Sequence, residues 1–360
     1  MWHVSVDGTM IGKINVVMPE PLITPTAQVD GNERTLSFAA NTEGQAVRID
    51  WGNGKMTDVT GIPAMDDYGT TLGITGTPVG EGNIKIYATD LAVFGCDSRV
   101  DGAQVTALDV TKATGLVELN CYTNSIETLD LSHNTALKKL NCYNNPISVL
   151  DLSHNTELTR LDAKQMKLTG IDLTGNTALT YLALSNNEIE HIDLSANQAL
   201  ASLYLLNCGL TDITLPNTES LTYISLNNNK LQTLDVTPCK GLATLFCMNN
   251  QLTELKAGDI SKNVNISGNK ITTVTGSSGR FSITSAELQH ANIANNKFST
   301  VLLTGNSNLD QLRCEGNPSL KSIDLTPAPE VSLVTCYNNS LTTLSAKSDS
   351  LPELRHLYCD

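Results

Sequence analysis

Aromatic residues are scarce in this chain of 360 residues, at 4% of the total, and acidic residues outnumber basic ones by 37 to 23. A compact core of this size ordinarily relies on Phe and Trp, so the interior must be filled mainly by aliphatic side chains. The net charge of −14 argues against nucleic acid or an anionic membrane surface as a partner, because both require a face rich in Lys and Arg. No run of about 18 apolar residues occurs, so no membrane insertion is predicted.

The patterns that carry catalysis or bind metal are also missing. No two cysteines have the close spacing of a zinc site, no Ser, His and Asp set stands out, and no glycine-rich loop follows a strand. His133 and His154 occupy equivalent positions without a third ligand, so surface histidines are expected. We therefore predict no enzyme activity, no cofactor and no metal. Residues 1–25 show neither a signal peptide nor a lipid-attachment cysteine, so they do not indicate the cellular compartment of the protein.

A repeat of 21 residues dominates what is present. Leucines begin successive units at Leu116, Leu137, Leu158, Leu179, Leu200, Leu221 and Leu242. Each unit follows LxxLxCxxNxLxxLDLSxNxx. A fixed period of this length is typical of a solenoid, in which each unit packs only against its neighbours.

Side chains alternate along an extended segment, so Leu119 and Cys121 are expected to point inward and Asn120 and Tyr122 outward. The second half-unit should also be strand-like, with Asp130 outward. A ladder of asparagines should bond the backbone of its own turn and of the next coil, at Asn124, Asn145, Asn187, Asn229, Asn250, Asn269, Asn296, Asn317 and Asn339. Met166 and Cys208 replace this asparagine in two coils, where we expect looser turns.

These motifs resemble the leucine-rich repeat, in particular its 21-residue bacterial variety with a nested LxxLDLSxN half-motif. The resemblance covers 91–360, since Leu91, Phe94 and Cys96 already have the spacing of Leu116, Leu119 and Cys121. It implies a non-enzymatic protein that is secreted or attached to the cell surface, often as an adhesin or a host-interaction protein.

The preceding part, 1–90, carries short alternating segments that predict a small β-sandwich. Strands are expected at Thr35–Ala39, Ala46–Trp51 and Ile84–Ala88. Trp51-Gly52-Asn53-Gly54 resembles the WGDG-type turn of PKD-like Ig-fold domains, with Asn53 where Asp is usual. The predicted fold class is therefore mainly β: a leucine-rich-repeat solenoid preceded by a small β-sandwich cap.

The inward cysteines and the outward aspartates can each be interpreted as structural residues or as residues that carry chemistry. Most cysteines occupy one inward position and are expected to be buried free thiols: Cys96, Cys121, Cys142, Cys247, Cys314, Cys336 and Cys359. Cys208 and Cys239 lie outside this column, and occasional disulfides or reactive thiols are the alternative. Outward aspartates at Asp109, Asp130, Asp151, Asp172 and Asp193 are expected to bond turn amides and hydroxyls, with calcium binding as the alternative.

The candidate binding residues lie at outward positions that the repeat leaves free. They are Tyr181, Tyr204, Leu206, Tyr223, Phe246 and Met248, with Tyr122 and Tyr143 nearer the N-terminus. Exposed aromatic side chains on a rigid sheet are typical of sites that bind proteins, although cross-strand rings can also simply stabilise a sheet. The expected partner is a protein, such as a host extracellular protein, or, alternatively, a glycan.

The spacing of the asparagine ladder changes to 19 and then 27 residues between Asn250 and Asn296. Gly276-Ser277-Ser278-Gly279 marks a loop there, which predicts an excursion on the side opposite the ladder. An enzyme that uses residues 270–290 is a third functional class.

Overall fold

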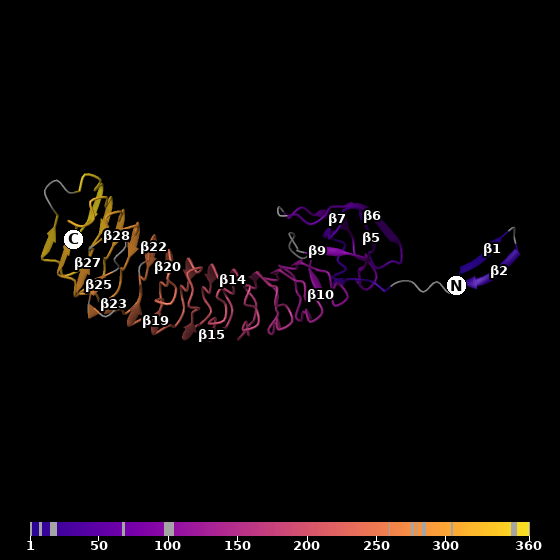
Figure 1. Cartoon of the computed structure of the whole chain (residues 1–360), viewed down its shortest axis with the longest axis horizontal. Coiled ribbons are helices and arrows are strands. Elements are labelled where there is room, and N and C mark those ends of the chain that lie inside the picture. Colours follow the sequence, from indigo (N-terminus) through magenta and orange to yellow (C-terminus); the bar gives the residue numbers. More distant parts are fainter. Residues whose placement is uncertain are drawn as a thin grey trace.

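The computed structural model describes residues 2–6, 9–14, 20–66, 69–96, 104–258, 260–274, 277–278, 280–282, 286–303, 305–346 and 351–359. Every regular element among them is a strand. The repeats form coils stacked in chain order, with one set of strands along each long side (Figure 1). The fold is a leucine-rich-repeat β-solenoid, as predicted.

One side of the solenoid is a 15-stranded sheet, called here the first sheet. Its strands from the repeats are parallel, and equivalent residues pair directly, as Leu119 with Leu140 and Leu140 with Leu161. The parallel strands are β9 (Leu91–Gly95), β11 (Glu118–Asn120), β12 (Lys139–Asn141), β13 (Arg160–Asp162), β14 (Tyr181–Ala183), β16 (Ser202–Tyr204), β18 (Tyr223–Ser225), β20 (Thr244–Phe246), β22 (Asn263–Asn265), β26 (His290–Asn292), β28 (Gln311–Arg313), β30 (Leu333–Thr335) and β32 (His356–Tyr358).

The core lies between the two sides of each coil and follows the predicted inward positions. Leu119 and Cys121 are fully buried, whereas Asn120 and Tyr122 are half-buried. Eight of the nine cysteines are buried free thiols, and Cys359 is exposed, contrary to its prediction. Burial raises the pKa of the Cys121 and Cys247 thiols to about 12, so these side chains remain protonated and act as small apolar residues.

The asparagine ladder occupies the turn that follows each strand of the first sheet. Asn145 Nδ2 donates to the carbonyl oxygens of Cys121 at 2.9 Å and Cys142 at 3.0 Å, and its Oδ1 accepts from the Ile126 N–H at 3.0 Å. Since Cys121 and Ile126 precede Asn145 by about one coil, the ladder ties each coil to the preceding one. The prediction that it reaches the next coil was wrong in direction. The same three-way arrangement recurs at Asn124, Asn187, Asn229, Asn250, Asn269, Asn296 and Asn317. Asn339 makes the same carbonyl bonds, but its Oδ1 accepts from the N–H of Asn317 itself.

The two coils without a ladder asparagine differ from each other. The Cys208 thiol donates to the Leu184 carbonyl at 3.3 Å, so it replaces one of the missing amide bonds. Met166 has no N–H or O–H to donate, and its Sδ lies 4.0 Å from the Cys142 Sγ. Of these two turns, the Met166 turn is therefore the one without a side-chain hydrogen bond to a carbonyl of the preceding coil.

The residue before each ladder position has a left-handed backbone. The φ angles lie between 52° and 60° at Thr123, Asn144, Gln165, Asn186, Asn207, Asn228, Asn249, Asn295 and Asn338. Asparagine tolerates this conformation better than most residues, which explains the recurring Asn-Asn pairs in the sequence. Thr123 is β-branched and adopts it at a cost.

The opposite side, called here the second face, carries shorter sheets. Its strands are β15 (His191–Asp193), β17 (Asp212–Thr214), β19 (Thr233–Asp235), β21 (Glu254–Lys256), β23 (Thr273–Val274), β24 (Ser277–Ser278), β25 (Arg280–Ser282), β27 (Thr300–Leu302), β29 (Ser322–Asp324) and β31 (Thr343–Ser345). The coils from 126 to 173 have no regular strand there, so the prediction of strands on both sides holds for part of the solenoid.

Outward aspartates of the second face bond the turn that follows them. The Asp130 Oδ1 accepts from the backbone N–H of Ser132 at 2.9 Å and from its hydroxyl at 2.7 Å. The backbone bond recurs at Asp109, Asp151, Asp172, Asp193, Asp235 and Asp324. This confirms the structural interpretation of the column.

A second asparagine column, which the sequence analysis did not single out, lies at the end of the second face. Asn155 Nδ2 donates to the carbonyls of Leu131 at 3.1 Å and Asn134 at 2.9 Å. Unlike the ladder, this column uses only its NH2 group. Among the described residues, no hydrogen bond reaches the buried Oδ1 atoms of Asn134, Asn155, Asn176 and Asn197.

The predicted excursion falls on the second face. β24 turns back to pair antiparallel with β23, and β25 then begins a new parallel set with β27. Gly276 and Gly279 themselves lie outside the described residues. The extra residues therefore leave the first sheet uninterrupted, since β22 pairs directly with β26.

The N-terminal strands are continuous with the solenoid. β4 (Arg34–Ala40) pairs antiparallel with β9 and with β7 (Leu72–Gly76), and so extends the first sheet. β3 (Thr24–Ala27) pairs with β10 (Val105–Asp109). A separate sheet contains β5 (Gln45–Asp50), β6 (Met56–Ile62) and β8 (Lys85–Tyr87), while β1 (Trp2–Val6) pairs with β2 (Thr9–Ile14).

Trp51 is 7% exposed and belongs to the same apolar core as the repeats. A Cβ at Gly76 would lie 2.2 Å from its ring, so close packing requires glycine there. The boundary at residue 90 and the likeness to Ig-fold domains stay predictions.

Candidate functional site

A row of four aromatic rings crosses the outward face of the first sheet. The ring centroids of Tyr181 and Tyr204 are 5.3 Å apart, those of Tyr204 and Tyr223 are 4.9 Å apart, and those of Tyr223 and Phe246 are 5.8 Å apart. All four side chains are half-buried. We call this set the aromatic row.

The strand register explains why these rings touch. Tyr181 and Tyr223 occupy the first position of their strands, and Tyr204 and Phe246 occupy the third. The directly opposite residues are small: Ala183 pairs with Tyr204, Ser202 with Tyr223, and Ser225 with Phe246. Each ring therefore leans over a small neighbour and meets the next ring diagonally. Burial raises the pKa of the Tyr181 and Tyr223 hydroxyls, so both stay neutral at physiological pH.

The other four predicted binding residues lie outside the aromatic row. Leu206 and Met248 are half-buried in the turns after β16 and β20. Tyr122 and Tyr143 stack with centroids 4.6 Å apart and an interplanar angle of 6°. The structure thus places the predicted rings in two groups.

Cations that the sequence analysis missed lie between these groups. The Arg160 guanidinium carbon is 3.6 Å from the centroid of the Tyr181 ring, and Lys164 Nζ is 5.2 Å from that of Tyr143. Both distances fit cation–π attraction. Arg160 and Lys164 occupy the same outward positions in the intervening coil, so the column analysis that found the tyrosines could have found them.

The charges on this face are largely paired within it. Lys139 Nζ is 3.2 Å from Glu118 Oε2, and Lys164 Nζ is 3.2 Å from Asp162 Oδ2. Asp162 is only 6% exposed, so its carboxylate is largely removed from solvent. Within the described ranges, no carboxylate lies within ion-pair distance of Arg160, which leaves its guanidinium for a partner.

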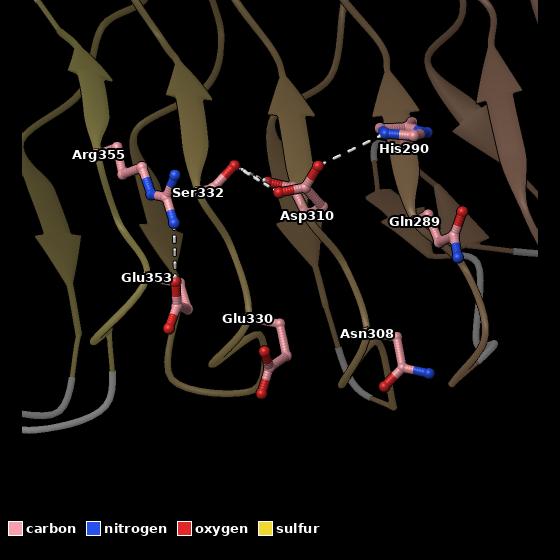
Figure 2. Close-up of a pocket in the computed structure, with 8 residues that line it drawn as sticks. All are labelled: Gln289, His290, Asn308, Asp310, Glu330, Ser332, Glu353 and Arg355. Atoms are coloured by element: carbon pink, nitrogen blue, oxygen red, sulfur yellow. Dashed lines mark hydrogen bonds and ion pairs between the residues drawn. The ribbon is translucent and has the colours of Figure 1, made fainter.

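A hollow of about 750 Å³ lies where the chain enters β26, β28, β30 and β32. Its lining includes His290, Asp310, Glu330, Ser332 and Arg355, shown in Figure 2. His290 Nε2 is 3.6 Å from Asp310 Oδ2, the Ser332 hydroxyl donates to the other Asp310 oxygen, and Arg355 pairs with Glu353 at 3.4 Å. Arg355 therefore balances Glu353, while Asp310 is contacted by the His290 ring and the Ser332 hydroxyl.

A second hollow, of about 450 Å³, begins at Phe246, where the aromatic row ends. Its lining is mostly polar: Asn263, Asn265, His290, Asn292, Gln311 and Arg313, with Val264 and Ala291 at the strand centres. It shares His290 with the first hollow.

Neither a metal cluster nor a membrane span emerges from the part of the chain that the structure describes. Within it, no group of three or more His, Cys, Asp or Glu side chains could hold a metal ion. The same residues include no helix long and apolar enough to cross a bilayer.

Comparison with known proteins identifies the fold of this chain, but it does not assign the chain to a protein family. No protein-family model and no curated protein sequence matches the chain. Among solved structures, the functional domain of InlJ from Listeria monocytogenes, described as including a cysteine ladder, is 29% identical with a TM-score of 0.58. The match covers 75% of this chain and 63% of that one, so this chain spans less than two thirds of its length.

The leucine-rich repeat domain of APL1B is 17% identical with a TM-score of 0.55, over 68% of this chain and 72% of that one. At that identity the likeness concerns the fold alone. Together these neighbours confirm the solenoid class, and the InlJ domain is a bacterial example of it.

Proposed function

We propose that this chain is a non-enzymatic protein-binding module of a secreted or cell-surface bacterial protein, of the adhesin or host-interaction type. The aromatic row of Tyr181, Tyr204, Tyr223 and Phe246 is its contact surface. The observation that carries the proposal is this contiguous set of half-exposed rings, each in contact with the next across four neighbouring strands of the first sheet. Large aromatic side chains dominate the binding energy of protein interfaces.

The row is also preorganised. Each ring touches its neighbour, Arg160 covers the free end of the row at Tyr181, and the parallel backbone beneath is held in register. Little side-chain freedom remains to be lost on binding, which favours affinity. The likeness to the bacterial InlJ domain supports an interaction role for the solenoid.

The test compares the intact chain with a double variant, Tyr204→Ala with Phe246→Ala. Partners captured from host extracellular proteins are identified, and their affinities for both forms are then measured. Loss of two hot-spot rings, each worth about 2 kcal/mol, should weaken binding by about 100-fold or more. Val149→Ala is the matched control, because Val149 is 77% exposed and lies away from the row.

Circular dichroism and thermal unfolding establish that the double variant stays folded. Unchanged affinity of a folded double variant would show that the aromatic row is not the site. A glycan array run with the same variants tests the carbohydrate alternative, for which Phe246 beside an amide-lined hollow is the relevant feature. Saccharide binding that disappears in the double variant, with no protein partner, would favour that alternative.

A further inference from the structure

Three side chains continue the line of the aromatic row beyond Phe246. Asn265, Asn292 and Arg313 occupy the third position of β22, β26 and β28, and the backbone register pairs each with the next, as Phe246 pairs with Asn265. Parallel strands lie about 4.8 Å apart, so the line from Phe246 to Arg313 is about 14 Å long. We call these three residues the donor row.

The two amides are oriented by their own turns. Asn265 Oδ1 accepts from the Ser267 N–H at 3.2 Å and from its hydroxyl at 2.8 Å, and Asn292 Oδ1 accepts from the Ala294 N–H at 3.2 Å. Because a backbone N–H can only donate, the atom that faces it must be the amide oxygen. The NH2 group of each side chain is then left over, and among the described residues it has no hydrogen-bond partner.

Arg313 adds a positive charge at the end of the line. Its side chain is exposed, and no carboxylate of the described residues lies within ion-pair distance. The nearest acidic residue along the chain, Glu315, accepts a hydrogen bond from the Thr335 hydroxyl at 2.5 Å. In a chain with a net charge of −14, this guanidinium provides a local attraction for anions at the end of the row.

The chemistry of the row selects its ligand. A neutral sugar hydroxyl both donates and accepts, and is usually met by side chains that do the same. Asn265 Oδ1 already accepts two hydrogen bonds and Asn292 Oδ1 accepts one, so the hydrogen-bonding groups that the donor row still offers are predominantly N–H donors. A carboxylate accepts without donating, so it matches two amide NH2 groups and a guanidinium.

We propose that the donor row is a carboxylate subsite of the binding surface, and that the partner presents an acidic peptide. The peptide lies extended along the solenoid, with an apolar side chain on Phe246 and an Asp or Glu carboxylate against Asn265, Asn292 and Arg313. About 14 Å corresponds to about four residues of extended chain, which sets the spacing between the apolar and acidic side chains. This inference rests on the proposed protein-binding function.

The experiment selects random 12-residue peptides displayed on phage against the full-length chain. The expected consensus has an aromatic or aliphatic residue followed within about four positions by Asp or Glu. Selected peptides are then synthesised, and their affinities are measured against the wild type, Arg313→Gln and Asn292→Asp. Asn292→Asp keeps the oxygen that accepts from Ala294 while it replaces the NH2 group by a repelling oxygen, so the turn is preserved.

Each substitution should weaken peptide binding by about 10- to 100-fold, and amidation of the peptide's acidic side chain should abolish the difference. Lys297→Gln is the control for charge, because Lys297 is exposed at the turn after the sheet and should leave binding unchanged. Thermal unfolding confirms that each variant is folded.

Three results would overturn the proposal in distinguishable ways. If the peptides lack acidic residues or bind Arg313→Gln as tightly as the wild type, the subsite is wrong, while loss of binding in the Tyr204→Ala and Phe246→Ala variant still supports the proposed function. If no peptides are enriched, or if neither set of variants affects them, both proposals fail. If only acidic glycans bind, and Arg313→Gln abolishes that binding, the carboxylate belongs to a saccharide and the peptide assignment is wrong.

Discussion

The first sheet and the second face are built from the same repeat, yet they use their outward positions differently. On the second face, the aspartate column recurs from coil to coil, and its carboxylates are bonded to the turns that follow. On the first sheet, outward residues change from stacked tyrosines to cations, to the aromatic row and then to the donor row. The comparison teaches that a polar residue that recurs from coil to coil stabilises the fold. The outward positions that vary from coil to coil are the ones available for binding a partner.

The two asparagine columns provide the strongest test of that distinction for the turns. Asn145→Ala removes four hydrogen bonds and leaves the Ile126 N–H and the Cys142 carbonyl without this partner, whereas the Cys121 carbonyl still accepts from Asn124 Nδ2. We expect a loss of about 3 kcal/mol in the free energy of unfolding, measured by urea denaturation. Asn155→Ala removes only two bonds, both from the NH2 group, and should cost less. Equal losses would show that the amide oxygen of the ladder contributes nothing.

A smaller effect is expected at the left-handed position before the ladder. Thr123 has a φ of 56°, which a β-branched residue adopts with strain, and most equivalent positions hold asparagine. Thr123→Asn should stabilise the chain by about 1 kcal/mol. The reciprocal change, Asn144→Thr, should destabilise it by a similar amount. If thermal unfolding shifts in neither variant, the preference for asparagine at this turn has another cause.

The smallest effect should come from the second face. Hydrogen bonds from the following Ser or Thr hold the pKa of Asp151 and Asp172 below the usual range. A carboxyl with a lowered pKa in the folded state contributes stability above its unfolded pKa, and loses it as the pH falls through the folded value. The double variant Asp151→Asn with Asp172→Asn should therefore lose less stability than the wild type between about pH 5 and pH 3.

Partner binding by this aspartate variant should equal that of the wild type, because both residues face away from the aromatic row. A loss of affinity in the folded variant would contradict the division between a structural and a functional face.

The sequence allowed much of the fold to be predicted, because apolar residues recur at the same inward positions in many coils. Leu119 and Cys121 could be placed by alternation alone, and so could the outward tyrosines. Contacts between rings could not be predicted, because they depend on which small residue pairs with each ring. The Asn-Asn pairs at the turns were visible in the sequence, but assigning a left-handed backbone to the first member required the structure.

The donor row was hidden for a different reason. Asn265 and Asn292 stand four residues before the ladder positions Asn269 and Asn296, so their place on the first sheet could be predicted, whereas their direct pairing across the excursion could not. Their amide orientation also depends on short contacts within the turn, at Ser267 and Ala294. Arg160 was missed although its column was known, because attention to large apolar side chains passed over a cation that covers one of them.

The in-register stacking of the coils has a mechanical consequence. The hydrogen bonds between neighbouring strands, such as those that pair β11 with β12 and β12 with β13, run along the solenoid rather than across it. A force that pulls the two ends apart would therefore load one rung of bonds at a time, and the coils would peel off in sequence. Each released coil of 21 residues would add about 70 Å of chain. A stretched molecule should thus yield in many small steps and absorb work while its remaining coils still hold their shape.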